Sequence, residues 1–227
     1  MHSIRVVVPL YERGDDVTKL LMNLEGLPLT VIIVDHHSLD IDFPSLLPTL
    51  QLKVNVIQNT GPFNLAKALQ TACASIQDSR AIVVLADADT VFDNAEETFR
   101  WIYQTLQAGG CYLCPNVSTQ AKPGKGLHYA SEFNGHVWVP TTDPHGAGFI
   151  ACTISQFRKC GGYLGSEFME ERGQRWGQAD SYLMARLDNI GLKRIRPTLT
   201  DVWLRENNRD PTDPWYAKTG GATWLNQ

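Results

Sequence analysis

The sequence predicts a single α/β domain with a mixed, mainly parallel sheet and helices on both of its faces. Short apolar runs rich in β-branched residues alternate with segments of helical periodicity through the first half of the chain. Strands that alternate with helices form parallel sheets that are covered on both faces. A chain of 227 residues is long enough for one sizeable core.

Each element is predicted from its own local pattern. Apolar β-branched runs predict strands at 4–10, 30–35, 53–59, 81–87 and 111–117. Apolar residues at helical spacing predict helices at 15–27, 64–76, 94–107 and 177–192. Asn94 or Asp93 is placed to cap the third of these helices. Residues 146–163 predict one more strand, a short helix and a Gly-Gly turn.

The second half of the chain is less regular. Residues 118–146 are rich in Gly, Pro, Thr and Lys and show little periodicity, which predicts a long irregular connection. Residues 204–227 combine Trp with Asn, Asp, Pro and Gly, and we expect an irregular tail there.

Composition limits the class of protein. The 24 acidic residues exceed the 20 basic ones, and the net charge of −4 counts against a general nucleic-acid binder. The five cysteines form one isolated CxxC pair, Cys111 and Cys114, for which packing at a strand end is the alternative to zinc or redox chemistry. No signal segment and no apolar run of about 20 residues is found, so a soluble cytoplasmic protein is expected.

Polar residues collect at the predicted carboxyl ends of four strands, the edge where parallel sheets bind ligands. The residues expected there are Pro9, Tyr11, Glu12, Asp35, His36, His37, Asn59, Gly61, Asp87 and Asp89. Asp87 and Asp89 lie one residue apart directly after an apolar strand. Paired carboxylates suit Mg²⁺ or Mn²⁺, which often share their ligands with substrate phosphates, whereas the alternative is a solvated turn or a helix cap.

Two further residues are candidates for chemistry. Lys67 lies one turn into its helix, where it could face a diphosphate or be an ordinary exposed lysine. Asp180 begins a helix behind Trp176 and Gly177. A carboxylate there is favoured by the helix dipole and could serve as general base on a hydroxyl, or be a helix N-terminal aspartate and no more.

Six segments in this order resemble the inverting GT-A glycosyltransferases of family 2, over residues 4–196. The segments are VVVPLYERGDDVTKLL, VIIVDHHSLD, NTGPFNLAKALQTA, VVLADADTVF, GAGFIACTISQFRKCGGY and RWGQADSYLMARL. The stretch from the Gly-Gly turn to RWGQADSYL also resembles the galactosyltransferase-type segment of chondroitin-synthase-like members. The resemblance implies a GT-A domain at 1–203, with a nucleotide-sugar-binding half at 1–117 and an acceptor and catalytic half at 118–203.

The resemblance also implies roles for the matching residues. Pro9, Tyr11 and Glu12 would line the base and ribose of the donor, and Asp35 and His36 would stand where family members bind uracil. The donor-binding residues expected in all are Pro9, Tyr11, Glu12, Asp35, His36, Asn59, Lys67 and Asp87.

For the chemical step, the resemblance implies a metal and a base. Asp89, with Asp87 beside it, would ligate Mn²⁺ or Mg²⁺. Asp180 would be the catalytic base, and Trp176 and Gly177 would shape the acceptor side.

Three positions depart from the family pattern. His36 replaces a second aspartate, which weakens the case for uridine as the nucleotide. Ala179 replaces the Glu of a Glu-Asp pair, which removes an acceptor contact but keeps the base. The late histidine that many members supply to the metal has no counterpart in 196–210, so water and phosphate would complete the shell, or His145 would substitute.

The function expected on these grounds is inverting transfer of a sugar from a nucleoside diphosphate, with UDP favoured, to a hydroxyl of a glycan. Residues 118–146 would close over the donor. Alternatives are a nucleotidyltransferase, a catalytically silent sugar-nucleotide-binding module, and a glycosyltransferase acting on a modified nucleic-acid base such as those of phage genomes. The last rests on late basic residues, namely Lys193, Arg194, Arg196, Arg205 and Arg209.

Overall fold

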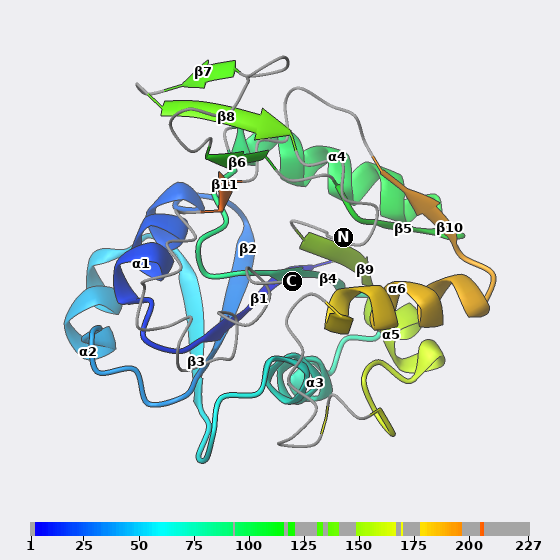
Figure 1. Ribbon diagram of the computed structural model, residues 1–227, viewed down its shortest axis with the longest axis horizontal. Coiled ribbons are helices and arrows are strands. Elements are labelled where there is room, and N and C mark those ends of the chain that lie inside the picture. The colour runs from blue at the N-terminus through cyan, green and yellow to red at the C-terminus, as the bar shows by residue number, and fades with distance from the viewer. Residues whose placement is uncertain are drawn as a thin grey trace, which may run out of the picture.

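A seven-stranded sheet forms the centre of the computed structural model, with strand order β10-β5-β9-β4-β1-β2-β3 (Figure 1). The structure describes residues 3–92, 94–115, 118–120, 131–133, 136–140, 149–166, 169, 178–196 and 205–206. The strands of this sheet are β1 (Ile4–Leu10), β2 (Leu29–Asp35), β3 (Lys53–Gln58), β4 (Ile82–Ala86), β5 (Cys111–Leu113), β9 (Phe149–Thr153) and β10 (Lys193–Ile195). The predicted mixed, mainly parallel sheet of a single domain is confirmed.

The pairing of the strands makes the sheet mixed. β1 lies between β2 and β4 and is parallel to both, and β3 extends the parallel set beyond β2. β9 is inserted antiparallel between β4 and β5, while β10 pairs in parallel with β5. As a result, the carboxyl ends of β1 and β4 lie side by side at one edge.

Helices cover both faces of this sheet, as predicted. One face carries α1 (Gly14–Asn23), α2 (Phe43–Leu46) and α4 (Ala95–Gln107), and a short 3₁₀ turn, η1 (Leu47–Thr49), follows α2. The other face carries α3 (Leu65–Ser75), α5 (Ile154–Cys160) and α6 (Gln178–Asn189). Because side chains alternate along a strand, Val6 and Val8 join the first core cluster and Val7 joins the second.

Local capping explains where several helices begin. The Asn94 side chain accepts a hydrogen bond from the Glu97 N–H at 3.3 Å, so Asn94 is the cap of α4. Asn64 caps α3 in the same way through the Lys67 N–H at 2.9 Å. Thr153 and Gln156 form a reciprocal capping box at α5.

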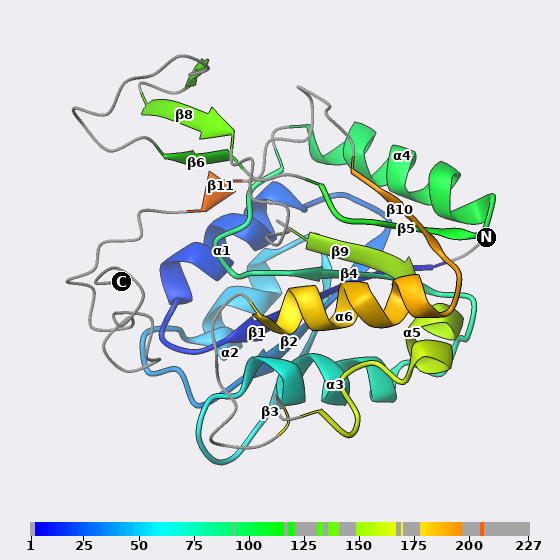
Figure 2. The same ribbon diagram turned by 45° about the vertical axis from the view of Figure 1, so that its right-hand side comes forward.

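A second, four-stranded sheet lies apart from the central one, beyond α1 and α4 (Figure 2). Its strands are β6 (Ser118–Gln120), β7 (Ser131–Phe133), β8 (His136–Pro140) and β11 (Arg205–Glu206), in the order β11-β6-β8-β7. The prediction of an irregular connection over 118–146 was therefore wrong at these three strands, and the predicted tail contains β11. Strands of two to five residues are too short for alternation to distinguish them from loop.

The cysteines serve packing. All five are buried and unbridged, and burial raises the pKa of each thiol, including those of the Cys111 and Cys114 pair. Thiols with raised pKa values are poor nucleophiles and poor metal ligands, which favours the packing interpretation of the CxxC pair. Over the part of the chain that the structure describes, no helix has both the length and the apolar character to cross a membrane.

Candidate functional site

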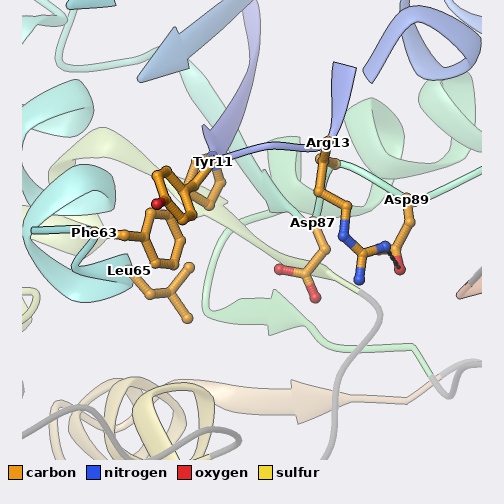
Figure 3. A pocket seen from close by; sticks show the side chains of 8 residues that line it. Tyr11, Arg13, Phe63, Leu65, Asp87 and Asp89 are labelled. Atoms are coloured by element: carbon orange, nitrogen blue, oxygen red, sulfur yellow. Dashed lines mark hydrogen bonds and ion pairs between the residues drawn. The ribbon is translucent and has the colours of Figure 1, made fainter. Parts of the chain in front are cut away.

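A pocket opens at the adjacent carboxyl ends of β1 and β4. Its lining residues are Pro9, Tyr11, Arg13, Phe63, Leu65, Asp87, Ala88 and Asp89 (Figure 3). Four of the predicted site residues, Pro9, Tyr11, Asp87 and Asp89, therefore lie together. Their convergence follows from the pairing of β1 with β4, which places the two following loops next to each other.

A second pocket adjoins the first and brings in the predicted base. It shares Pro9, Leu65 and Asp87 with the first pocket and is completed by Leu69, Leu85, Ala86, Phe149, Ile150 and Asp180. Asp180 lies in the first turn of α6, the helix that packs on the same sheet face as α3. Burial raises the pKa of the Tyr163 phenol, and the negative charges of Asp180 and, more weakly, Asp87 raise it further.

The Asp87–Asp89 segment is a turn directly after β4. The Thr90 N–H donates to the Asp87 carbonyl at 3.1 Å, and the intervening Ala88 is buried. Both carboxylates therefore belong to the pocket wall. Asp89 Oδ2 lies 3.3 Å from Nη1 of Arg13, whose guanidinium also donates to Asp16 Oδ2 at 2.9 Å. The Arg13 and Asp89 side chains are 13% and 12% exposed, so water screens this ion pair only in part.

A divalent cation suits this carboxylate pair only with help from a substrate. No group of three or more potential protein ligands gathers within the described ranges. Mg²⁺ is nevertheless held in many enzymes by one or two carboxylates together with substrate phosphates and water. Asp87 and Asp89 fit that arrangement. His145, the predicted substitute ligand, lies outside the described residues.

An aromatic group forms one wall of the first pocket. The Tyr11 and Phe63 rings are stacked, with centroids 5.8 Å apart and an interplanar angle of 24° (Figure 3). The His36 ring meets Phe63 edge-on at 5.1 Å. Stacked aromatic rings offer a flat apolar surface of the kind on which nucleobases pack.

His36 and Asn59, both predicted donor-side residues, contact each other. Asn59 Nδ2 lies 3.2 Å from His36 Nε2, so with the amide donating, the neutral ring carries its proton on Nδ1. Nδ1 is buried and makes no hydrogen bond of normal geometry within the described structure. Burial lowers the pKa of His36, against weaker opposing effects of the Gly61 backbone and of Asp35. The imidazole is therefore neutral at pH 7.

Asp35 holds the loop that follows β2. Its Oδ1 accepts the Ser38 N–H at 3.0 Å and its Oδ2 accepts from Gln58 Nε2 at 3.0 Å. The carboxylate is 3% exposed and lines a separate open hollow formed with residues 37–39, 41–44 and 58. The structure thus places Asp35 away from the two pockets, and its role toward a base stays a prediction.

Lys67 and Glu12, two further predicted residues, are not among the residues that line the two pockets. Lys67 is exposed on α3, and Glu12 has φ 50° and donates its N–H to Ser38 Oγ at 3.0 Å. Trp176 and Gly177 lie outside the described residues. Ala179, which stands where the family pattern has Glu, is 4% exposed and belongs to the core cluster against which α6 packs. An acidic side chain at this position would therefore be buried.

Four residues that line the first pocket, Arg13, Phe63, Leu65 and Ala88, are not predicted as site residues by the sequence. Arg13 follows the predicted strand end by three residues, and Phe63 and Leu65 flank the cap of α3. Proximity to a strand end is the signal that could have identified Arg13. Phe63 carries no such signal, because its place in the pocket depends on how the turn after β3 folds back toward Tyr11.

Solved structures of related shape were found, whereas no protein-family model and no curated protein sequence matches the chain. TarS 1–349 from S. aureus in complex with UDP is 15% identical, with a TM-score of 0.62 over 90% of this chain and 60% of that one. The mannosyltransferase PcManGT from Pyrobaculum calidifontis, in complex with GDP-Man and Mn²⁺, is 20% identical, with a TM-score of 0.57 over 94% and 59%. A 4-diphosphocytidyl-2C-methyl-D-erythritol synthase is 10% identical, with a TM-score of 0.54 over 96% and 98%.

At these identities the likeness shows the fold, which is the Rossmann-like GT-A fold. The chain spans about 60% of the length of TarS 1–349 and of PcManGT.

Proposed function

We propose that this chain is an inverting glycosyltransferase of the family-2 type that moves a sugar from a nucleoside diphosphate to a hydroxyl acceptor. The observation that carries the proposal is that Asp87 belongs to two adjoining pockets, one with Tyr11 and Asp89 and the other with Asp180. A donor diphosphate at Asp87 and Asp89 would then present its sugar toward Asp180. The complexes of the fold neighbours with UDP and with GDP-Man and Mn²⁺ support a nucleotide-sugar donor.

The residues of the chain divide the work of such a transfer. The Tyr11–Phe63 stack packs against the base, and Pro9 closes the pocket beneath it. Asp180 takes the proton of the acceptor hydroxyl, whose oxygen attacks the anomeric carbon from the side opposite the diphosphate and inverts its configuration. When bound at Asp89 and Asp87, Mn²⁺ or Mg²⁺ would neutralise charge on the departing diphosphate.

One of the late basic residues that suggested a nucleic-acid acceptor has its charge compensated inside the domain. Arg194 is paired with Asp188 and donates to the Tyr112 hydroxyl, so its charge is compensated within the domain. A protein that contacts several phosphates needs free cations and loses affinity steeply with salt. Activity that is insensitive to salt would agree with a glycan, and a steep loss would favour the nucleic-acid acceptor.

A screen of nucleotide sugars tests the proposal. The protein is incubated with UDP-, GDP- and other nucleoside-diphosphate sugars, Mn²⁺ and mixtures of glycan acceptors, and release of nucleoside diphosphate is measured. Release with one donor supports the transfer. Release of pyrophosphate from a nucleoside triphosphate and a sugar phosphate would instead indicate the nucleotidyltransferase alternative. No release under either condition, with donor binding retained, would favour the silent binding module.

A further inference from the structure

Arg13 is the cation that the chain itself brings into the candidate donor pocket. It follows β1, lines the pocket beside Tyr11 and Asp87, and is held between Asp16 of α1 at 2.9 Å and Asp89 at 3.3 Å (Figure 3). Lys67, the residue expected to face the diphosphate, is exposed on α3 and does not line this pocket.

Arg13 and a divalent cation compete for the same carboxylate. Mg²⁺ binds oxygen ligands at about 2.0–2.1 Å. A guanidinium in ion-pair contact with Asp89 Oδ2 opposes such binding by its charge and by occupying the oxygen. A poorly solvated carboxylate also needs a counter-ion, because leaving it unpaired is costly. In the protein without nucleotide, that requirement is met by Arg13.

We propose that Arg13 is an internal counter-ion of Asp89 that the metal displaces, and that its guanidinium then binds the diphosphate of the donor. The inference rests on the proposed function. This exchange of partners makes the binding of metal and the binding of nucleotide depend on each other. When the metal binds Asp89, the nucleotide diphosphate gives Arg13 a new anionic partner.

The geometry supports this exchange of partners. A guanidinium carries five N–H donors in a planar fork, which matches two phosphate oxygens as well as two carboxylate oxygens. Asp16 lies on α1, outside the pair Asp87 and Asp89, and keeps the Arg13 side chain at the pocket when Asp89 is released. Arg13 can therefore stay at the pocket while its partner changes from carboxylate to diphosphate.

Binding of Mn²⁺ alone, followed by electron paramagnetic resonance, tests the competition. Arg13→Gln is expected to bind Mn²⁺ without nucleotide roughly tenfold more tightly than the wild type. Calorimetry at saturating Mn²⁺ is expected to show roughly tenfold weaker binding of UDP or GDP to the same variant. Lys19→Gln is the matched control, since it removes one positive charge from the exposed side of α1, and it should change neither affinity.

Opposite changes in the two affinities separate the proposed role from a structural one. A variant that is merely misfolded would lose both. Equal Mn²⁺ binding by Arg13→Gln and Lys19→Gln, or unchanged nucleotide binding by Arg13→Gln, would overturn the counter-ion role.

A second pair of variants keeps the proposal testable if Arg13→Gln does not fold. Asp16→Asn removes one of the two acidic partners of Arg13 and leaves Asp89. Mn²⁺ without nucleotide should therefore bind to Asp16→Asn several-fold more weakly than to Asp15→Asn. Asp15→Asn is the control, because it removes an exposed carboxylate from the same helical turn. Equal binding by these two variants would contradict the proposal.

Asp89→Asn distinguishes failure of this inference from failure of the proposed function. If Asp89→Asn does not weaken Mn²⁺ binding, or if the wild type binds neither UDP nor GDP, the proposed function itself is contradicted. Suppose instead that Asp89→Asn abolishes Mn²⁺ binding and the wild type binds nucleotide. Wild-type affinities of Arg13→Gln for Mn²⁺ and for nucleotide would then refute the counter-ion role and leave the proposed function standing.

Discussion

Asp180 and Asp87 line the same pocket, although Asp180 lies in the first turn of α6 and Asp87 follows β4. Phe149 and Ile150 of β9 line the same pocket, because β9 is inserted beside β4 in the sheet. The proposed transfer needs both carboxylates at one cavity, because Asp180 would act on the acceptor hydroxyl while Asp87 and the metal hold the departing diphosphate.

Replacement of the predicted base should separate binding from turnover. Asp180→Asn keeps the shape of the side chain but cannot take a proton, so we expect transfer to fall by about 10²–10⁴-fold. Affinity for nucleoside diphosphate, measured by calorimetry, should be nearly unchanged. Asp15→Asn, an exposed aspartate on α1, serves as control and should keep full turnover. Full turnover of Asp180→Asn would show that another group is the base.

Loss of the aromatic surface should weaken nucleotide binding. Phe63→Ala removes the ring that stacks on Tyr11, and we expect roughly tenfold weaker binding of UDP or GDP, since one stacking contact contributes about 1–3 kcal/mol. Phe63→Tyr keeps the ring and should retain the affinity. Turnover at saturating donor should change little in either variant. Equal affinity of Phe63→Ala and the wild type for UDP or GDP would show that the nucleobase binds elsewhere.

Burial of His36 should make stability depend on pH. Its native pKa lies below the unfolded value of about 6.5, so the unfolded chain takes up the proton first as the pH falls. The stabilisation is complete above about pH 6.5 and is lost progressively down to the lowered native pKa, below which the decline levels off.

Urea unfolding at about pH 7.5 and about pH 5.5 measures this effect. The wild type should lose more unfolding free energy on acidification than His36→Asn. His37→Asn, which replaces the exposed neighbour, should behave as the wild type does. An identical loss in the wild type and in His36→Asn would rule out His36 as the source.

The close approach of the start of α1 to the loop at Asp40 should make Gly14 intolerant of a side chain. Its N–H donates to Asp40 Oδ2 at 2.7 Å, and an added Cβ would overlap the Asp40 carbonyl oxygen and crowd Ile41. Gly14→Ala should therefore lower the free energy of unfolding by roughly 1–3 kcal/mol, measured in urea. Asp15→Ala, at the exposed next position, is the control and should stay within about 0.5 kcal/mol of the wild type. Wild-type stability of Gly14→Ala would contradict the tight contact.

Much of the candidate site was predictable because its signals are local. Asp87 and Asp89 directly follow an apolar β-branched run, and Asp180 lies in the first turn of a helix that the sequence predicts. A strand end and a helix start can both be read from a few neighbouring residues. The same reasoning assigned Asp35 to the site, and that assignment stays a prediction; in the structure its carboxylate accepts hydrogen bonds from the Ser38 N–H and from Gln58 of β3.

The sequence by itself determined the order of helices and strands, which strand faces are apolar, and that acidic and aromatic side chains follow the strands. These properties depend on short-range periodicity and capping. Only the tertiary structure decided that β1 lies beside β4, which pairs Arg13 with Asp89, and that Phe63 stacks on Tyr11. It also decided that His36 is buried and that Asp180 shares a pocket with Asp87. The physical reason is that packing of the whole core decides which distant strands pair. The same packing inserts β9 antiparallel into an otherwise parallel sheet, and no local sequence pattern contains this information.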